Sequence, residues 1–455
     1  MKTHHDHSHG HHEGMVHEPS AQTLEEYTRA LAQAQPLEGA RVIRLELEAR
    51  ETEWEFTPGV ISQAWSYNGQ IPGPVIEGRV GDVLEVRLTN MLPEGTMIHW
   101  HGIRLPASMD GTENVQHPVA PGTSFVYRFQ LRDAGTFWYH PHINETIQLE
   151  RGLYGALLVR DDNEPQLDRE RVLVLDDVAL DDNGKIRPAG GWNEKHDGRQ
   201  GSTLLLNGKS NRELRVNAGQ TERWRVINAA SARYVRLSIG GKPFRILGTD
   251  GGLINQAITA TEVLLAPGDR FDLAVGPLQE GDVPGLDALE YNRGSIVQSK
   301  RERFATVRVV GAAPSHATLP DTLRHIQPLA GRTAAPTRVV KLGYQPTREA
   351  PAFTINDESH HRAEPVRLGE LQVWDVVNES DVDHPFHLHG FFFQVLEVNA
   401  QAPAYLSWED TVNVPAKGSV RIAWLPDERP GEWMYHCHIL EHHAGGMMAH
   451  FQVIG

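Results

Sequence analysis

The chain of 455 residues has a single cysteine, Cys437, and only eight methionines. One thiol cannot form an intramolecular disulfide, so core packing has to stabilise the fold, and the sequence leaves the redox compartment open. No apolar run approaches the roughly 18 residues that a membrane helix requires, so we expect no membrane span. Basic residues are also scarce: 43 Lys and Arg against 59 Asp and Glu give a net charge of −16. This excess of negative charge argues against nucleic acid or an anionic membrane surface as a partner.

The first residues carry histidines and no recognisable secretion signal. Seven of the 25 histidines fall within residues 1–17. No charged start followed by an apolar stretch of roughly 7–15 residues is present, so a signal peptide either has been removed or never existed. We expect a periplasmic or extracellular location, with a cytoplasmic one left open. Residues 1–38 are predicted to be a disordered tail and linker, whose histidines either capture copper or nickel or derive from an expression tag or a genomic accident.

Three similar stretches divide the remainder of the chain. In each, a glycine is followed nine positions later by an asparagine: Gly81 and Asn90, Gly219 and Asn228, Gly369 and Asn378. The residues between them alternate apolar and polar, as strands of a β-sandwich do. We therefore predict an all-β protein of three related sandwich domains, 39–162, 163–312 and 313–455. Few short helices are expected, the clearest over residues 21–35.

The segment around Cys437 carries a metal-ligand pattern. His442 follows the cysteine by five positions and Met447 by ten. A thiolate, imidazoles and a weak thioether form the ligand set of a blue-copper electron-transfer site, which needs one further histidine. His384 can supply it. The less favoured alternatives are His443 and Met448, the residues directly after these two ligands.

Histidine pairs of the form His-x-His occur four times, at 99/101, 140/142, 387/389 and 436/438. Side chains alternate on a strand, so the two imidazoles of a pair share a face, roughly 6–7 Å apart along the backbone, while Cys437 points to the opposite face. The tripeptide around Cys437 would thus join two metal sites. Eight imidazoles are enough for three copper ions, with positions left open for a small molecule. The middle domain has no pair, so the cluster should lie between domains 1 and 3, with domain 2 mostly a spacer and interface element.

These four segments resemble the copper-binding motifs of the multicopper oxidases, in the laccase-like bacterial branch, over about residues 40 to 455. The resemblance implies three cupredoxin-like Greek-key domains and four copper ions per chain: one type 1, one type 2 and two type 3. It implies that a donor gives single electrons to the type 1 copper and that four electrons reduce O2 to water. The implied ligands are His384, Cys437, His442 and Met447 for type 1; His99 and His387 for type 2; His101, His140 and His438 for one type 3 ion; and His142, His389 and His436 for the other.

Two further residues bear on the protons that O2 reduction consumes. Asp110, in a Met-Asp-Gly loop nine residues after His101, resembles the acidic residue that the family places near the type 2 copper, and a carboxylate there could relay protons. The alternative is an Asp that only forms the turn before Gly111. Many bacterial relatives carry a Glu directly after the second type 1 histidine, where this chain has His443. That departure leaves the second relay in question.

Two functions stay open at this stage. A laccase-like enzyme would oxidise phenolic or aromatic amine donors with O2, whereas a copper-handling protein would oxidise or sequester Cu(I), with phenol turnover incidental. Copper-detoxifying relatives often carry a methionine-rich insert near the type 1 site, and the methionines here are widely spread, which favours the enzyme. The histidine-rich start favours copper handling. The sequence does not set the oligomeric state, and a monomer is compatible with it.

Overall fold

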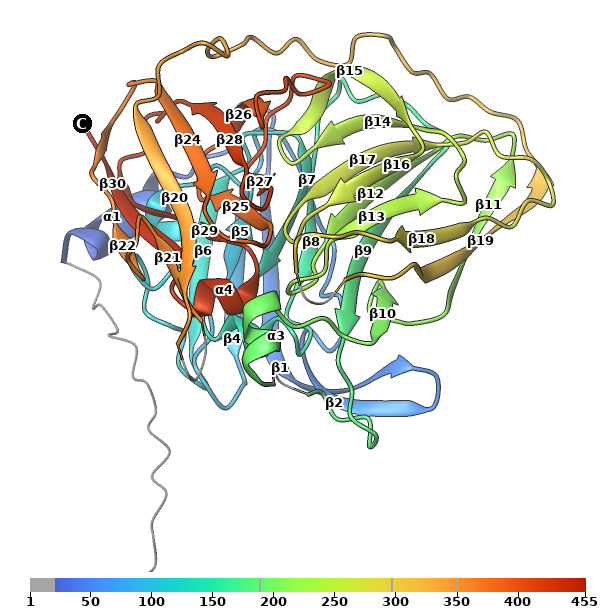
Figure 1. The fold of residues 1–455 in the computed structure, drawn as a ribbon, viewed down its shortest axis with the longest axis horizontal. Helices are drawn as coiled ribbons and strands as arrows, with labels where there is room; N and C mark the ends of the chain where they lie inside the picture. The colour runs from blue at the N-terminus through green and yellow to red at the C-terminus, as the bar shows by residue number, and fades with distance from the viewer. Residues whose placement is uncertain (1–20, 188–189, 296–297, 348–350) are drawn as a thin grey trace, which may run out of the picture.

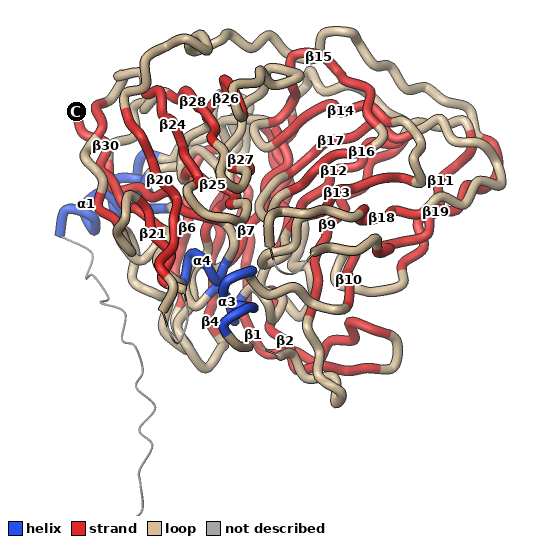
Figure 2. The backbone as a smooth tube through the Cα atoms, in the orientation of Figure 1, coloured by secondary structure: helices blue, strands red, loops and turns tan. Residues whose placement is uncertain are grey.

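The structure is a computed structural model, and it describes residues 21–187, 190–295, 298–347 and 351–455. The histidine-rich stretch and its predicted metal capture lie outside the described residues. The helix expected over residues 21–35 is α1 (Ala21–Gln33). Within the described residues the other helices are short, as Figure 2 shows: α2 (Glu145–Gln148), α3 (Trp192–Asp197), α4 (Leu440–Ala444) and the 3-10 turn η1 (Ala107–Met109). None of the helices in this part of the chain combines the length and the apolar composition needed to cross a bilayer.

Strands make up most of the regular structure and form three successive pairs of sheets (Figure 1), which confirms the predicted all-β class. The first sandwich, residues 42–160, has the sheets β2-β1-β4-β6 and β3-β8-β7-β5. Its strands are β1 (Val42–Thr57), β2 (Val60–Tyr67), β3 (Ile76–Arg79), β4 (Val83–Asn90), β5 (His99–His101), β6 (Ser124–Gln130), β7 (Gly135–His140) and β8 (Gly155–Arg160).

The middle sandwich, residues 169–312, has the sheets β10-β9-β12-β17-β14-β15 and β11-β19-β18-β13-β16. Its strands are β9 (Arg169–Val178), β10 (Thr203–Leu206), β11 (Arg212–Ala218), β12 (Glu222–Asn228), β13 (Val235–Ile239), β14 (Phe244–Thr249), β15 (Gly252–Ala260), β16 (Glu262–Leu265), β17 (Arg270–Val275), β18 (Gly285–Leu289) and β19 (Glu302–Ala312).

The third sandwich, residues 338–454, has the sheets β21-β20-β24-β28-β26 and β22-β30-β29-β25-β27, with β23 paired to β30. Its strands are β20 (Arg338–Gln345), β21 (Ala352–Ile355), β22 (His361–Arg362), β23 (Val366–Arg367), β24 (Gln372–Asn378), β25 (His384–Leu388), β26 (Phe393–Val398), β27 (Thr411–Val414), β28 (Ser419–Trp424), β29 (Gly431–Cys437) and β30 (Met448–Ile454). Domain boundaries near 162 and 312 remain our proposal.

The repeated glycine and asparagine have the same structural role in all three sandwiches. Each glycine has a positive φ that only glycine adopts without strain: 94° at Gly81, 82° at Gly219 and 73° at Gly369. Each asparagine ends a strand and closes the following loop with its side-chain amide. In the third copy, Asn378 donates to the carbonyls of Val382 and Val414, at 2.7 and 3.0 Å, just before His384. In the first and third copies the repeat therefore shapes the loop that leads into a histidine motif.

The first and third sandwiches share one hydrophobic core and therefore lie directly against each other. One continuous cluster of buried side chains extends through both the first and third sandwiches, from Leu47 to Val453, while the middle sandwich has a core of its own. Figure 1 shows the red and orange strands of the third sandwich beside β5 and β7. Strand β12 is buried along its whole length despite carrying polar residues. Its Arg223 and Arg225 pair with Asp272, so charge pairing replaces the expected alternation where two sandwiches meet.

Candidate metal centres

Eight imidazoles converge between the first and third sandwiches. Antiparallel pairing of β5 with β7 sets His99 opposite His140, and pairing of β25 with β29 sets His387 opposite His436. The two pairs of strands face each other. The rings of His101 and His387 stack with centroids 3.9 Å apart. All eight side chains are at most 5% exposed: His99, His101, His140, His142, His387, His389, His436 and His438.

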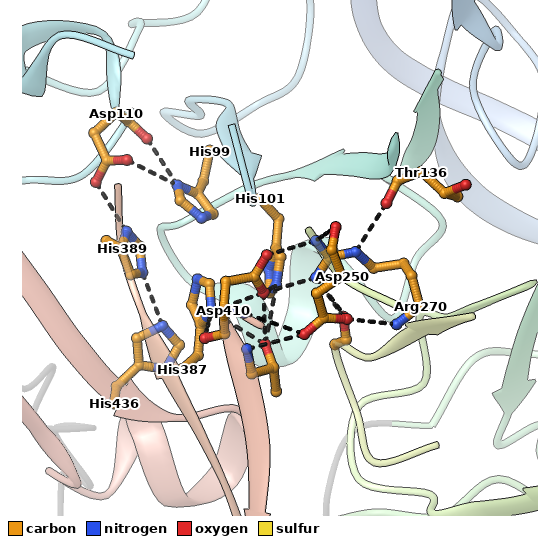
Figure 3. Close-up of polar contacts among 12 residues, drawn as sticks. His99, His101, Asp110, Thr136, Asp250, Arg270, His387, His389, Asp410 and His436 are labelled. Carbon is orange, nitrogen blue, oxygen red and sulfur yellow. Dashed lines mark hydrogen bonds and ion pairs between the residues drawn. The ribbon is translucent and has the colours of Figure 1, made fainter. Parts of the chain in front are cut away.

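In most of these rings one nitrogen is held by an oxygen of the protein, as Figure 3 shows for several of them. Nδ1 contacts a backbone carbonyl in four cases: His99 with Asp110 at 2.9 Å, His140 with Pro141 at 2.8 Å, His387 with Asp410 at 2.9 Å and His436 with Cys437 at 2.9 Å. Because a ring nitrogen that donates to a carbonyl must carry hydrogen, the other nitrogen of a neutral ring has a free lone pair. These contacts were not identifiable from the sequence.

The opposite nitrogens of four rings lack hydrogen-bond partners in the part of the chain that the structure describes: His99 Nε2, His101 Nδ1, His140 Nε2 and His387 Nε2. Both nitrogens of His438 lack such partners as well. Burial, followed by repulsion between neighbouring rings, lowers the pKa of His140 and His142 well below the usual value. These two rings are therefore neutral and can each offer a lone pair. A buried polar atom left without a partner costs about 1–3 kcal/mol. Several such atoms at one point fit metal ions as the missing partners.

The inward nitrogens form overlapping groups in which the atoms lie within 4.8 Å of one another. One group is His142, His389 and His436, the set expected for a type 3 ion; a second joins the expected type 2 pair, His99 and His387, to His389. The third expected set has ring centroids 5.0 to 5.7 Å apart: His101, His140 and His438.

A second centre surrounds Cys437, whose side chain lies on the other face of β29. The Sγ atom is 3.4 Å from His384 Nδ1 and 3.5 Å from His442 Nδ1, and those two nitrogens are 3.0 Å apart. All three side chains, and Met447, are fully buried. Burial lowers the pKa of His384 to about 3 and raises the pKa of the Cys437 thiol. Burial therefore disfavours the charged thiolate form of Cys437 unless a bound metal cation neutralises it.

The ring nitrogens of His384 and His442 that face away from Cys437 also have hydrogen-bond partners. His384 Nε2 lies 2.8 Å from Ser380 Oγ, and His442 Nε2 lies 2.7 Å from the carbonyl oxygen of His196. His196 belongs to α3, which contacts α4, the helix that carries His442. The ring of Trp192 stacks on His196 at 4.9 Å. The middle sandwich therefore covers the His442 edge of the centre.

Asp110 lies at the cluster, directly after the 3-10 turn η1 and before Gly111. Its Oδ2 is 2.8 Å from His389 Nδ1, and the side chain is buried. The following Gly111 has φ +73°, and a Cβ there would lie 1.8 Å from the carbonyl oxygen of Ile98. The glycine is needed for the close approach that brings Asp110 between His99 and His389.

His443 reaches the cluster indirectly, through a carboxylate that sequence reasoning missed. Its Nδ1 is 2.8 Å from Glu145 Oε2, and Glu145 Oε1 is 3.1 Å from His142 Nδ1. The ring of His443 also lies 4.4 Å from that of His436. An acidic group is thus present beside His443, contributed by the first sandwich. The only signal in the sequence was the position of Glu145 three residues after His142.

Domain 2, which we expected to be mostly a spacer and interface element, contributes interface residues directly behind the cluster. Arg270 and Asp250 of the middle sandwich contact Asp410, which in turn contacts His101 and His387 (Figure 3). Neither residue lies near a histidine motif in the sequence. Their role depends on how the three sandwiches pack.

Known proteins resemble this chain along most of its length. Three family models with the description "Multicopper oxidase" match residues 48–164, 170–283 and 334–454. The chain is 31% identical to "Multicopper oxidase MmcO" of Mycobacterium tuberculosis, over 87% of this chain and 84% of that protein. It is 27% identical to "Laccase-2" of Cryptococcus neoformans, over 85% and 80%. The solved structure "Multicopper oxidase from Campylobacter jejuni: a metallo-oxidase" matches with TM-score 0.81 and 30% identity, covering 91% of this chain and 92% of its own.

Proposed function

The chain belongs to the multicopper oxidase family, and on that premise we propose that it oxidises phenols and aromatic amines one electron at a time and reduces O2 to water. The family binds copper at type 1, type 2 and type 3 sites and uses O2 as the acceptor. The observation that supports the proposal is the tripeptide His436-Cys437-His438 at the end of β29: the Cys437 Sγ lies beside His384, while the rings of His436 and His438 lie among the cluster imidazoles.

We assign the ligands accordingly. His384, Cys437, His442 and Met447 would hold the type 1 ion, and His99 with His387 the type 2 ion. The type 3 ions would be held by His101, His140 and His438, and by His142, His389 and His436. When bound, copper supplies the one-electron redox chemistry and the binding position for O2. The protein joins the two centres by the backbone of one tripeptide and keeps water out, since these ligands are almost fully buried.

Two buried carboxylates would supply protons to the cluster. Asp110 Oδ2 can hold a proton shared with His389 Nδ1, and Glu145 can hold one between His142 and His443. O2 reduction to water consumes four protons for four electrons, so groups that deliver protons to a site closed to bulk water are required. The pair Glu145 and His443 would take the place of the glutamate that many bacterial relatives carry after the second type 1 histidine.

A second candidate function, oxidation of Cu(I), is favoured by the surroundings of the type 1 centre. Helix α3 covers the His442 edge. Ser380, which contacts His384, lines a pocket of about 350 Å³ together with three acidic residues, Asp357, Glu379 and Asp381, and one basic residue, Lys417. An acidic pocket attracts cations, so it suits a metal ion or a protonated amine better than a neutral phenol. The Campylobacter jejuni relative is called a metallo-oxidase, and a donor of this kind is consistent with that term.

The test is copper analysis of the purified protein together with O2 uptake, measured separately on a phenol, an aromatic amine and Cu(I). We expect about four coppers per chain and an intense blue absorption from the Cys437 thiolate. O2 uptake on the phenol and the amine supports the proposal. Uptake on Cu(I) alone would replace it with the second candidate. Absence of the blue absorption in fully loaded protein would contradict the ligand assignment itself.

A further inference from the structure

A buried ion pair joins all three sandwiches directly behind the histidine cluster. Asp410, which precedes β27, and Arg270, the first residue of β17, are at most 1% exposed. The Arg270 guanidinium donates two hydrogen bonds to the Asp410 carboxylate, from Nη1 to Oδ1 at 2.7 Å and from Nη2 to Oδ2 at 2.5 Å. This two-point geometry is the strongest form of a carboxylate–guanidinium pair. It is needed here, because a buried pair with poor geometry would not offset the cost of removing both charges from water.

Every N–H of the Arg270 guanidinium has an acceptor. Besides Asp410, it donates from Nε to the carbonyl of Thr136 in the first sandwich at 3.1 Å, and to the carbonyls of Gly268 and Asp250, each at 3.1 Å. The carboxylate of Asp250 completes the arrangement by accepting from the backbone N–H groups of Arg270 and Thr411, at 2.9 and 3.0 Å. A lysine could not make these contacts, since it lacks the planar fork of five donors.

Asp410, one member of this ion pair, contacts two rings of the cluster, His101 from the first sandwich and His387 from the third. Asp410 Oδ1 is 3.0 Å from His101 Nε2, and its backbone carbonyl accepts from His387 Nδ1 at 2.9 Å. Thr411 Oγ1 lies within 3.2 Å of both rings. Room for the pair is provided by Gly102, where a Cβ would meet Arg270 Nη2 at 2.4 Å and Asp410 Oδ2 at 2.5 Å. The glycine after the first His-x-His motif is therefore explained by this contact.

His101 differs from His99, His140 and His387 in the nitrogen that lacks a hydrogen-bond partner among the described residues. That nitrogen is Nε2 in those three rings and Nδ1 in His101. The ionised Asp410 accounts for this difference, because a carboxylate can only accept and therefore keeps the hydrogen of the neutral ring on Nε2. Two-point pairing with the Arg270 guanidinium is the geometry of an ionised carboxylate, which has no hydrogen of its own to donate to His101.

We propose that Arg270 and Asp410 are positioning residues of the cluster: Arg270 fixes the Asp410 carboxylate, and Asp410 fixes His101 with Nδ1 facing the metal position. The middle sandwich thereby sets the metal affinity of a site whose ligands all come from the other two. The inference rests on the proposed ligand assignment. It adds a role for the one sandwich that has no copper motif.

The experiment measures copper retention in Asp410→Asn and Arg270→Lys by competition with a chelator of known affinity, with the blue absorption recorded in the same samples. Removing a residue that orients a metal ligand typically weakens metal affinity about 10–100-fold. We expect Asp410→Asn to weaken the affinity for the cluster copper by that factor. Arg270→Lys should weaken it less, because lysine keeps the positive charge but lacks the planar guanidinium. The blue absorption should stay, because the Cys437 centre has its own ligands.

A matched control is Asp177→Asn. It removes the same charge from a different buried ion pair, one that lies entirely within the middle sandwich. Its partner Arg233 bonds to Asp177, Glu302 and the carbonyl of Gly201, all within that sandwich. Equal copper loss in Asp177→Asn and Asp410→Asn, or full retention in Asp410→Asn, would overturn the inference. If Asp410→Asn does not fold, the copper loss of Arg270→Lys is compared with that of Asp177→Asn instead. Wild-type protein that never holds more than the blue copper would instead contradict the proposed function.

Discussion

Replacement of Asp110 by Asn separates three roles for this residue by the size of their effects. Asn forms Asx turns as well as Asp does, so a residue that only shaped the turn before Gly111 would leave the protein unchanged. The amide oxygen can still accept from His389 Nδ1, which Oδ2 now meets at 2.8 Å. Only the charge of this bond is lost. The carbonyl of Asp110 continues to accept from His99.

The magnitudes differ enough to tell these roles apart. Hydrogen bonds to charged groups contribute about 1.5–3 kcal/mol and neutral ones about 0.5–1.5 kcal/mol, so the lost charge should cost ~1 to 1.5 kcal/mol. That corresponds to roughly tenfold weaker copper retention. A positioned proton donor contributes about 10²–10⁴-fold to a rate. If Asp110 relays protons, reoxidation by O2 should slow by that larger factor, while reduction of the type 1 copper should be spared.

Stopped-flow measurement of the two half-reactions provides the assay. Anaerobic bleaching of the blue absorption by excess donor reports reduction of the type 1 centre, and its return on mixing with O2 reports reoxidation. Copper-loaded samples of equal content remove the effect of weaker retention. A normal reoxidation rate in Asp110→Asn at every pH would exclude Asp110 from proton delivery and leave it as a turn and positioning residue.

The remaining predictions concern the other parts of the site. Cys437→Ser should abolish the blue absorption and turnover and leave the eight-imidazole cluster able to hold copper; a variant that stays blue would refute the type 1 assignment. Met447→Leu should raise the type 1 potential and keep the blue absorption, and an unchanged potential in redox titration would indicate Met448 as the axial group. Glu145→Gln should slow reoxidation without slowing reduction, since it removes the carboxylate between His142 and His443; equal rates in wild type and variant would exclude this relay. Deletion of residues 1–17 should leave phenol oxidation intact and slow loading at limiting copper, and equal loading rates would show that these histidines capture no metal.

The metal-binding motifs were predictable because their information is local. A His-x-His pair on a strand puts both rings on one face whatever the rest of the chain does. Of the four pairs, 99/101 lies wholly on a strand, while the second histidine of each other pair lies just beyond the end of β7, β25 or β29; all eight rings are nevertheless buried. The three repeats were also recognisable locally, because Gly81 and Asn90 and their counterparts are nine residues apart, although each asparagine also bonds to a carbonyl from a more distant strand or loop. The all-β class and its few short helices also follow from such short-range patterns.

Contacts between sandwiches decided the rest. Asp410 is 309 residues from His101 and 140 from Arg270 along the chain, and Glu145 is 298 residues from His443. No periodicity in the sequence links such positions, because their approach depends on how whole sheets pack against one another. The sequence alone singled out the side chains that we propose as copper ligands, since ligand type and strand alternation are properties of a few adjacent residues. Only the tertiary structure decided which nitrogen each ring presents and how the middle sandwich takes part, since both depend on acceptors and charges that packing brings together from distant strands.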